Sequence, residues 1–437
     1  MNEDAVFKRY DVRGKYPGEL DEEFCRRMGK ALGTFSQKEY SGEIVVCRDN
    51  KQTSMRLREA VIEGLISTGT DVYVAGTGTT DYAAFVGRIF DAVSVQVTSS
   101  HLSLDTNGLK FMYPEGNGFV NRDLDQLERL FRQQEFSEGR GNRARVEKAS
   151  RKQYIDEMKG FLTEIPGSFQ GKKIVVDTMG GAATEVLPDM LEELGAVIID
   201  VSEEKPERPY YDPPDPKPEM LEKSRKRMEE ENADLLLAND MDADRVAAYN
   251  GRWISGDEIF GVFTQLFENV DIVGSLDTSR AVDDLADIHG STLHRTRVGD
   301  PFVMEKALET AAALTGEPNG HYAFLDFVPY NSGILSALVL AKIDLETYLD
   351  NVPDYHTLKK DIEVEDKQEV MKKIKAEVGQ RYGVISETDG VKFSSGSATV
   401  LVRSSGSSEV IRLKAESQDK EEAEQVMDEA EALVRNQ

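Results

Sequence analysis

The sequence has little cysteine and no long apolar run. Only two of its 437 residues are cysteines, Cys25 and Cys47, and they do not form a C-x-x-C pair. This scarcity excludes a disulfide scaffold and a zinc ribbon, and it fits a reducing compartment such as the cytoplasm. No apolar stretch approaches the roughly 18 residues that a membrane-spanning helix needs, and residues 1–4 are not a basic segment that leads into an apolar one. We therefore expect a cytoplasmic protein that has no membrane as partner.

Positive charge is scarce relative to negative charge. The chain carries 53 Lys and Arg residues against 80 Asp and Glu residues, so its formal net charge is −27. Such a surface repels nucleic acid and anionic membranes, which excludes both as expected partners. A phosphate ligand would need a local basic pocket or a bound cation. The sequence does not distinguish a monomer from a dimer.

Strand and helix patterns alternate along most of the chain. Strand patterns at 43–47, 71–75 and 92–97 are separated by amphipathic helix patterns, which is typical of βαβ units with a largely parallel sheet. The alternation restarts near Lys172 and again near Val246. The expected fold class is therefore α/β, with mixed, largely parallel sheets.

Two stretches depart from this alternation. The basic stretch 138–149 is expected to be a linker that contains a helix. From about Tyr355 the pattern predicts a helix, then short strands, and then a charged helix over 420–435. That order favours a C-terminal domain of α+β type.

A cluster of carboxylates follows a predicted buried strand at 233–238. Asp240, Asp242 and Asp244 alternate with small or apolar residues, and Arg245 ends the run. An open α/β sheet binds its ligands at such strand ends. Three carboxylates this close repel one another, and a hard divalent cation such as Mg²⁺ or Ca²⁺ would relieve that repulsion.

The acidic run has other interpretations. An EF-hand loop is disfavoured, because the sixth residue counted from Asp240 is Arg245 rather than Gly, and the twelfth is Gly251 rather than Glu. A nucleophile pair of the haloacid dehalogenase type would need Thr or Val in place of Asp244. A solvated acidic turn in an acidic protein also stays open.

Ser100 stands where another strand pattern ends. His101 follows it directly, and Lys110 comes shortly after. A serine in such a place can act as a nucleophile when a base takes its proton and a cation stabilises the developing charge. The alternative is a capping serine in a hydrophilic loop.

Two further loops carry polar groups that suit a sugar phosphate. Glu317, Asn319 and His321 stand in one Gly-bounded loop, which suits recognition of sugar hydroxyls. A Ser/Gly loop nearer the C-terminus combines arginines, hydroxyls and backbone N–H groups, which suits a phosphate, although it lacks the spacing of a Walker loop. Each loop has a structural turn as its alternative. The residues of the Ser/Gly loop and its flank are Arg403, Ser405, Gly406, Ser407 and Arg412.

The order of these four loops resembles that of the α-D-phosphohexomutase superfamily, and the resemblance covers essentially the whole chain. Residues 240–245 resemble the family motif D-G-D-x-D-R, with Met241 in place of Gly. Residues 98–101 resemble the start of T-x-S-H-N-P, and residues 107–110 match the N-G-x-K that follows it. Residues 10–14 resemble the Y-D-I-R-G of the phosphomannomutase/phosphoglucomutase branch.

The loops also depart from the family pattern. Leu102 and Ser103 replace the Asn-Pro of the serine loop, which removes a rigid turn and predicts a looser loop. Asn319 replaces the Ser of G-E-x-S-G-H. The last loop resembles R-P-S-G-T-E-P, with Ser407 in place of Thr and Ser408 in place of Glu.

The resemblance implies four domains around a central cleft, of which three are related α/β domains and the fourth is α+β. We expect the domain with the phosphoserine loop at 1–148 and the domain with the metal loop at 149–250. We expect the domain with the sugar-recognition loop at 251–352, and the domain with the phosphate-binding loop at 353–437.

The resemblance also implies a phosphohexomutase of carbohydrate metabolism. Such an enzyme interconverts hexose 6-phosphate and hexose 1-phosphate through a phosphoserine and a bisphosphate intermediate. The opening at 10–14 favours phosphomannomutase/phosphoglucomutase activity. Phosphoglucosamine mutase, a non-catalytic sugar-phosphate-binding relative and a Ca²⁺-binding acidic protein are the alternatives.

Residue roles follow from the same resemblance. Ser100 would carry the phosphate, and His101, Lys110, Arg13 and Arg245 would take part in catalysis. The expected ligands of Mg²⁺ are Asp240, Asp242, Asp244 and the phosphorylated Ser100. The expected substrate-binding residues are Glu317, Asn319, His321, Arg403, Ser405, Gly406, Ser407 and Arg412.

Overall fold

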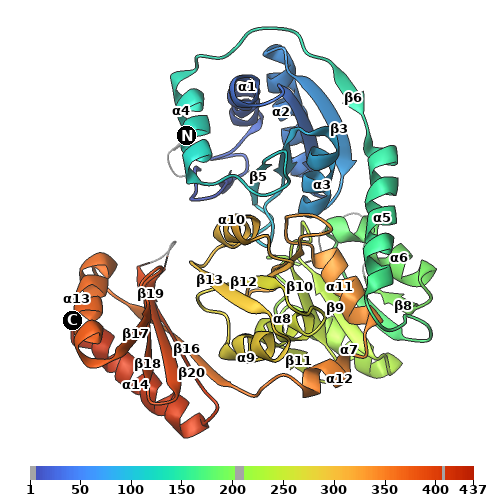
Figure 1. The fold of residues 1–437 in the computed structure, drawn as a ribbon. Coiled ribbons are helices and arrows are strands. Elements are labelled where there is room, and N and C mark those ends of the chain that lie inside the picture. The colour runs from blue at the N-terminus through green and yellow to red at the C-terminus, as the bar shows by residue number, and fades with distance from the viewer. Residues whose placement is uncertain (1–5, 202–210, 406–408) are drawn as a thin grey trace. The chain divides into compact units, whose positions relative to one another are not determined.

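The computed structural model describes residues 6–201, 211–405 and 409–437 (Figure 1). These residues form two compact units. Unit 1 comprises residues 1–256 and 319–345, and unit 2 comprises residues 257–318 and 346–437. Within the described ranges, no helix is long and apolar enough to cross a membrane.

The first sheet of unit 1 is mixed, with strand order β1-β5-β4-β2-β3-β6. Strands β2, β3, β4 and β6 are parallel, whereas β5 pairs antiparallel with both β4 and β1. Helices α1, α2 and α4 share one apolar core with the sheet, and α3 packs against α5 and strands β2 and β4. The elements are β1 (Val12–Lys15), α1 (Glu22–Glu39), β2 (Glu43–Arg48), α2 (Gln52–Ser67), β3 (Asp71–Thr77), α3 (Thr80–Phe90), β4 (Val93–Val97), β5 (Thr106–Met112), α4 (Asn121–Gln133), β6 (Arg143–Arg145) and α5 (Glu147–Glu164).

The second sheet of unit 1 has the order β11-β10-β9-β7-β8, in which β7, β8 and β9 are parallel and β10 and β11 are antiparallel. Helix α11 packs against β9 and β10. The elements are β7 (Lys173–Asp177), a 3₁₀ helix (Ala182–Glu185), α6 (Leu187–Glu193), β8 (Val197–Asp200), α7 (Glu222–Glu231), β9 (Leu235–Asn239), β10 (Val246–Tyr249), β11 (Trp253–Ile254) and α11 (Gly333–Lys342). Unit 1 also contains the short strand β15 (Tyr322–Phe324), which is not part of this sheet.

The acidic run is the loop of a β-hairpin. Strand β9 is buried along its whole length, which explains its apolar sequence, and its last residue Asn239 pairs with Val246 of β10. Residues 240–245 therefore connect the two strands. Ala243 has a φ of 53°, whereas the φ of Met241 is not positive. The backbone at Met241 consequently does not require the glycine of the family motif.

Unit 2 contains a parallel sheet in which β12 pairs with β13 and β14, and a C-terminal antiparallel sheet of order β16-β20-β19-β18-β17. Helices α13 and α14 cover one face of the C-terminal sheet and share its apolar core (Figure 1). The elements are α8 (Gly256–Thr264), β12 (Asp271–Ser275), α9 (Arg280–Ile288), β13 (Thr292–Thr296), α10 (Asp300–Thr310), β14 (Leu314–Gly316), α12 (Leu345–Asp350), β16 (His356–Glu363), α13 (Lys367–Arg381), β17 (Gly383–Ser386), β18 (Val391–Ser395), β19 (Ala398–Ser404), β20 (Val410–Ser417) and α14 (Lys420–Arg435).

The predicted fold class is confirmed, but two local predictions need correction. The C-terminal domain begins with strand β16 rather than a helix. As an edge strand, β16 buries little of its surface, so its sequence lacks a clear apolar alternation. The stretch 138–149, predicted as a linker with a helix, also contains strand β6, which is exposed throughout and pairs with β3 at the sheet edge.

Gly333 marks a close approach between α11 and the acidic hairpin. Its N–H donates to the Ala243 carbonyl at 2.9 Å, and a Cβ there would lie 2.3 Å from the Arg245 carbonyl oxygen. We expect Gly333→Ala to displace the hairpin and destabilise the protein by about 1–3 kcal/mol. Gly160→Ala in α5 is the control, because that Cβ would meet no atom within 4 Å and should add about 0.5–1 kcal/mol of stability. The urea-unfolding midpoint should fall for Gly333→Ala and rise for Gly160→Ala. A Gly333→Ala midpoint that equals the wild-type value would contradict this packing.

Candidate active site

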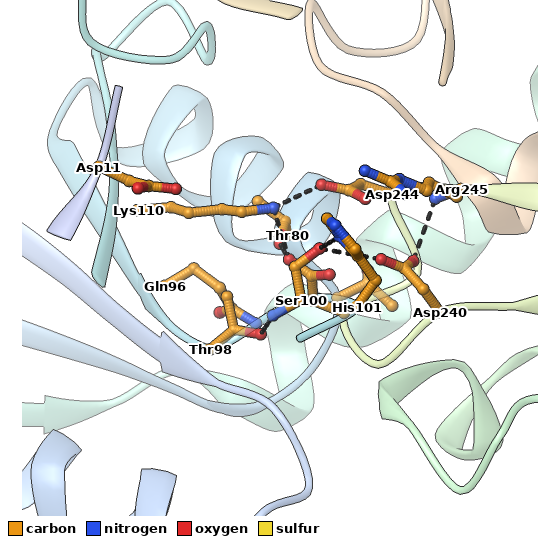
Figure 2. Close-up of polar contacts among 12 residues, drawn as sticks. Asp11, Thr80, Gln96, Thr98, Ser100, His101, Lys110, Asp240, Asp244 and Arg245 are labelled. Atoms are coloured by element: carbon orange, nitrogen blue, oxygen red, sulfur yellow. Dashed lines mark hydrogen bonds and ion pairs between the residues drawn. The ribbon is translucent and has the colours of Figure 1, made fainter. Parts of the chain in front are cut away.

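Ser100 lies against the acidic hairpin, although the two segments are far apart in sequence (Figure 2). The Ser100 hydroxyl donates to Asp240 Oδ2 at 2.9 Å and lies 3.1 Å from His101 Nδ1. Its backbone is in the left-handed region, with φ 49°, which is uncommon for a residue other than glycine and recurs at functional sites. The Thr98 hydroxyl accepts from the Ser100 N–H at 2.9 Å and supports this turn.

His101 is electrically neutral at ordinary pH. Burial lowers the pKa of its imidazole far below the usual value, and the positive charges of Arg245 and Arg13 lower it further. A neutral imidazole keeps a lone pair on one ring nitrogen. Since the Ser100 hydroxyl gives its one proton to Asp240, the Nδ1 of His101 within hydrogen-bond distance of it can donate a hydrogen bond to the serine oxygen.

The three aspartates of the hairpin form a compact, buried cluster. Ligand oxygens of Asp240, Asp242 and Asp244 all lie within 4.8 Å of one another, and each side chain is at most 1% exposed. Asp242 Oδ1 has no hydrogen-bond partner among the described residues. Buried all-oxygen ligands with an unsatisfied atom fit a hard divalent cation.

Lys110 of β5 partly balances the charge of this cluster. Its ammonium lies 2.7 Å from Asp242 Oδ2 and 2.5 Å from Asp244 Oδ2. Burial lowers the pKa of Lys110, but the two carboxylates outweigh burial and hold that pKa well above its ordinary value. Burial, together with the charges of Asp244 and Asp242, raises the pKa of Asp240 well above its usual range. Lys110 alone therefore does not offset the three carboxylates, and without a further cation the cluster favours the protonated form of Asp240.

Arg245 and the loop 319–321 enclose the hairpin on another side. Arg245 forms an isolated β-bridge with His321, and its Nε lies 3.1 Å from His321 Nε2. The same imidazole nitrogen is 3.2 Å from Asp244 Oδ1, and the Asn319 side chain accepts from the His321 N–H at 3.3 Å. Burial opposes ionisation of Asp244, but Lys110, His321 and Arg245 hold its pKa well below the usual range.

Arg13 reaches the site from β1. It is paired with Gly108 in the β1–β5 register, and its Nε donates to Asp11 Oδ2 at 2.6 Å. Burial lowers the pKa of Arg13, but Asp11 outweighs burial, and Asp242 and Asp244 also raise it. Arg13 is thus a permanent cation that interacts with the acidic hairpin.

The remaining predicted residues belong to unit 2. Glu317 is buried and accepts from the Gly299 N–H at 3.0 Å. Arg403 and Arg412 are cross-strand neighbours on β19 and β20, and with Lys359 they line a cavity of about 310 Å³. The Ser405 N–H donates to the Val410 carbonyl at 2.9 Å. Gly406 and Ser407 lie outside the described residues.

The sequence analysis missed two residues that contact this site. The ammonium of Lys51, which is 4% exposed, donates to Ser99 Oγ at 2.9 Å and to the Thr106 carbonyl at 2.6 Å. The hydroxyl of Thr80 donates to Asp242 Oδ2 at 2.6 Å. Lys51 and Thr80 each follow the C-terminal end of a strand, and this position is the one feature of the sequence that could have identified them as site residues.

Lys51 ties together the two ends of the serine loop. These two hydrogen bonds restrain the loop at Ser99 and at Thr106, while the looser loop expected from the missing Asn-Pro stays a prediction. We expect Lys51→Met to expose loop 98–106 to faster amide hydrogen exchange, with the opening free energy falling by about 1–3 kcal/mol. Lys15→Met is the control: its ammonium lies 3.6 Å from Asp105 of the same loop but is 69% exposed, so exchange should stay unchanged. Equal exchange in the two variants would argue against the restraint.

Comparisons with known proteins show which family this chain belongs to. Models of phosphoglucomutase/phosphomannomutase alpha/beta/alpha domains I, II and III and of the C-terminal domain match residues 4–138, 152–253, 255–354 and 360–433. A phosphoglucomutase/phosphomannomutase of Thermococcus kodakarensis is 31% identical over 97% of each chain. A probable phosphoglucosamine mutase of Methanocella arvoryzae is 30% identical over 99% of this chain and 98% of the relative.

Solved structures show the same fold. A phosphoglucomutase/phosphomannomutase family protein from Burkholderia thailandensis superposes with a TM-score of 0.89 at 22% identity, covering 100% of this chain and 98% of its own. An N-acetylphosphoglucosamine mutase from Aspergillus fumigatus, in complex with GlcNAc-6P and magnesium, gives a TM-score of 0.65 at 14% identity and covers 99% and 96%. The chain described here therefore belongs to the phosphoglucomutase/phosphomannomutase family.

Proposed function

We propose that this chain is a phosphohexomutase that interconverts hexose 6-phosphate and hexose 1-phosphate, with phosphomannomutase/phosphoglucomutase as its activity. The observation that carries the proposal is the hydrogen bond from the Ser100 hydroxyl to Asp240, inside a buried cluster of three carboxylates. The cluster can hold a cation beside the serine, and family membership supplies the reaction class.

Mg²⁺ is the cation that we propose for this cluster, held by Asp240, Asp242, Asp244 and an oxygen of the phosphorylated Ser100. When bound, it would neutralise charge on the phosphoryl oxygens during transfer. The A. fumigatus relative was solved with magnesium, which supports this choice. Arg13 and Arg245 would add fixed positive charge beside the same phosphoryl group.

Lys110 is the group that we propose for proton transfer. As the phosphoryl group leaves Ser100 for a sugar hydroxyl, the serine oxygen gains a proton and the sugar hydroxyl loses one. Asp242 and Asp244 keep Lys110 protonated, so it would give its proton to the serine oxygen, take up the proton of the sugar hydroxyl and end the step as an ammonium again. The return transfer reverses this exchange. His101, whose Nδ1 lies 3.1 Å from Ser100 Oγ, would take part by holding the serine oxygen in place through a hydrogen bond.

The remaining predicted residues would hold the rest of the substrate. Arg403, Ser405, Gly406, Ser407 and Arg412 would bind the phosphate that is not being transferred, while Glu317, Asn319 and His321 would bind sugar hydroxyls. Such a grip converts the transfer into an intramolecular step, which can contribute on the order of 7–11 kcal/mol of barrier reduction. The four-domain division at 1–148, 149–250, 251–352 and 353–437 is part of this proposal, because each segment contains one of the four loops.

Phosphoglucosamine mutase is the second candidate activity. Relatives named as probable phosphoglucosamine mutases match this chain about as well as the phosphoglucomutase/phosphomannomutase does. The kcat/KM values for glucose 1-phosphate, mannose 1-phosphate and glucosamine 1-phosphate would decide between them. A preference for the amino sugar would overturn our first choice without affecting the phosphoserine chemistry.

The phosphoenzyme is the direct test of the proposal. After incubation with glucose 1,6-bisphosphate and Mg²⁺, intact mass and peptide mapping should show one phosphoryl group on Ser100. Ser100→Ala should carry none and should lose at least about three orders of magnitude in kcat, as expected when the nucleophile is removed. Ser103→Ala, in the same loop, should be phosphorylated as the wild type is. Near-full activity of Ser100→Ala would refute the mechanism, and hexose-phosphate binding without phosphorylation or turnover would indicate a non-catalytic relative.

A further inference from the structure

Thr80 connects helix α3 to the acidic hairpin through two hydrogen bonds. Its backbone N–H donates to the Asp242 carbonyl at 3.0 Å, and its hydroxyl donates to Asp242 Oδ2 at 2.6 Å. Thr80 is fully buried, so water does not compete for either bond. The sequence singles out no motif at this position.

The two oxygens of Asp242 have different surroundings. Oδ2 accepts from the Thr80 hydroxyl and also from the Lys110 ammonium at 2.7 Å, whereas Oδ1 has no hydrogen-bond partner within the described part of the chain. A carboxylate oxygen that already accepts two hydrogen bonds is a poorer ligand for a cation than its unsatisfied partner. We infer that Thr80 is a positioning residue that turns the Asp242 carboxylate so that Oδ1 is its metal ligand, an inference that rests on the proposed metal site.

Thr80 can hold this orientation because the start of α3 is itself fixed. The next residue, Asp81, is fully buried and accepts from the Tyr154 hydroxyl of α5 at 2.7 Å. Asp81 also accepts from the Tyr82 N–H at 2.9 Å and from the Thr79 hydroxyl. The α3 N-terminus is therefore tied to α5 from one side and to the hairpin from the other.

Lys110 alone would orient Asp242 less strictly than Thr80 does. Its ammonium lies on a flexible stem and is shared between Asp242 and Asp244. The β-branched side chain of Thr80 has few χ1 rotamers, and its backbone is held by the bond to the Asp242 carbonyl. Hydrogen bonds that orient a metal ligand typically account for a 10–100-fold effect on metal affinity or activity.

The test is direct Mn²⁺ binding, measured by electron paramagnetic resonance on the full-length protein. Thr80→Val removes only the hydroxyl and keeps the backbone bond, and we expect its Mn²⁺ dissociation constant to rise roughly ten-fold or more. Thr80→Ser keeps the hydroxyl and should retain most of the wild-type affinity for Mn²⁺. Thr34→Val is the matched control, because it removes a buried hydroxyl that donates to the Lys30 carbonyl at 2.8 Å and accepts from the Ser137 N–H at 2.9 Å. Neither of these bonds involves the acidic hairpin, so the Mn²⁺ affinity of this variant should equal that of the wild type.

The outcomes separate this inference from the proposed function. If the wild type binds no Mn²⁺, the proposed metal site fails, and this inference fails with it. If the wild type binds Mn²⁺ and Thr80→Val binds it equally well, only the role of Thr80 is overturned, even when that variant unfolds at lower urea. If the role is correct, Thr80→Val should lower kcat with little change in the KM for hexose phosphate, and raising the Mn²⁺ concentration should restore kcat.

Discussion

Repulsion among three buried carboxylates is the constraint on which the rest of this site depends. Asp240, Asp242 and Asp244 share one short hairpin loop, where a low dielectric strengthens their mutual repulsion. Unpaired charges do not persist in such surroundings. The cluster therefore needs cations around it, and a divalent ion would supply the positive charge that the neighbouring side chains do not.

The fold brings those compensating groups from separate segments of unit 1. Lys110 comes from β5, which is the neighbour of the β1 strand that carries Arg13. A β-bridge to Arg245 places His321 beside the hairpin, and α11 packs closely against the hairpin at Gly333. Ser100 enters the same cluster from the end of β4, so the same packing assembles the proposed nucleophile and the proposed cation site (Figure 2).

Local sequence patterns were sufficient for the fold class, but not for the contacts that bring the loops of the candidate site together. The apolar run before Asp240 predicted a buried strand because β9 is covered on both faces. Strands β6 and β16 lie at sheet edges and bury little surface, so no apolar alternation identified them. Thr80 and Lys51 were missed because each acts on a segment distant in sequence. The serine loop was predicted to be loose because it lacks Asn-Pro. That prediction could not take account of Lys51, which follows β2 and donates to the Thr106 carbonyl.

The central claim is that Ser100 and the three aspartates hold one phosphate and one metal ion in direct contact. Phosphorus NMR of the protein phosphorylated on Ser100 tests it most directly, with Mn²⁺ added in place of Mg²⁺. The account predicts that stoichiometric Mn²⁺ broadens the phosphoserine signal beyond detection, because the paramagnetic ion would be bound to that phosphate, and that Asp240→Asn keeps a sharp signal at the same Mn²⁺ concentration. A phosphoserine signal that stays sharp in the wild type would contradict it.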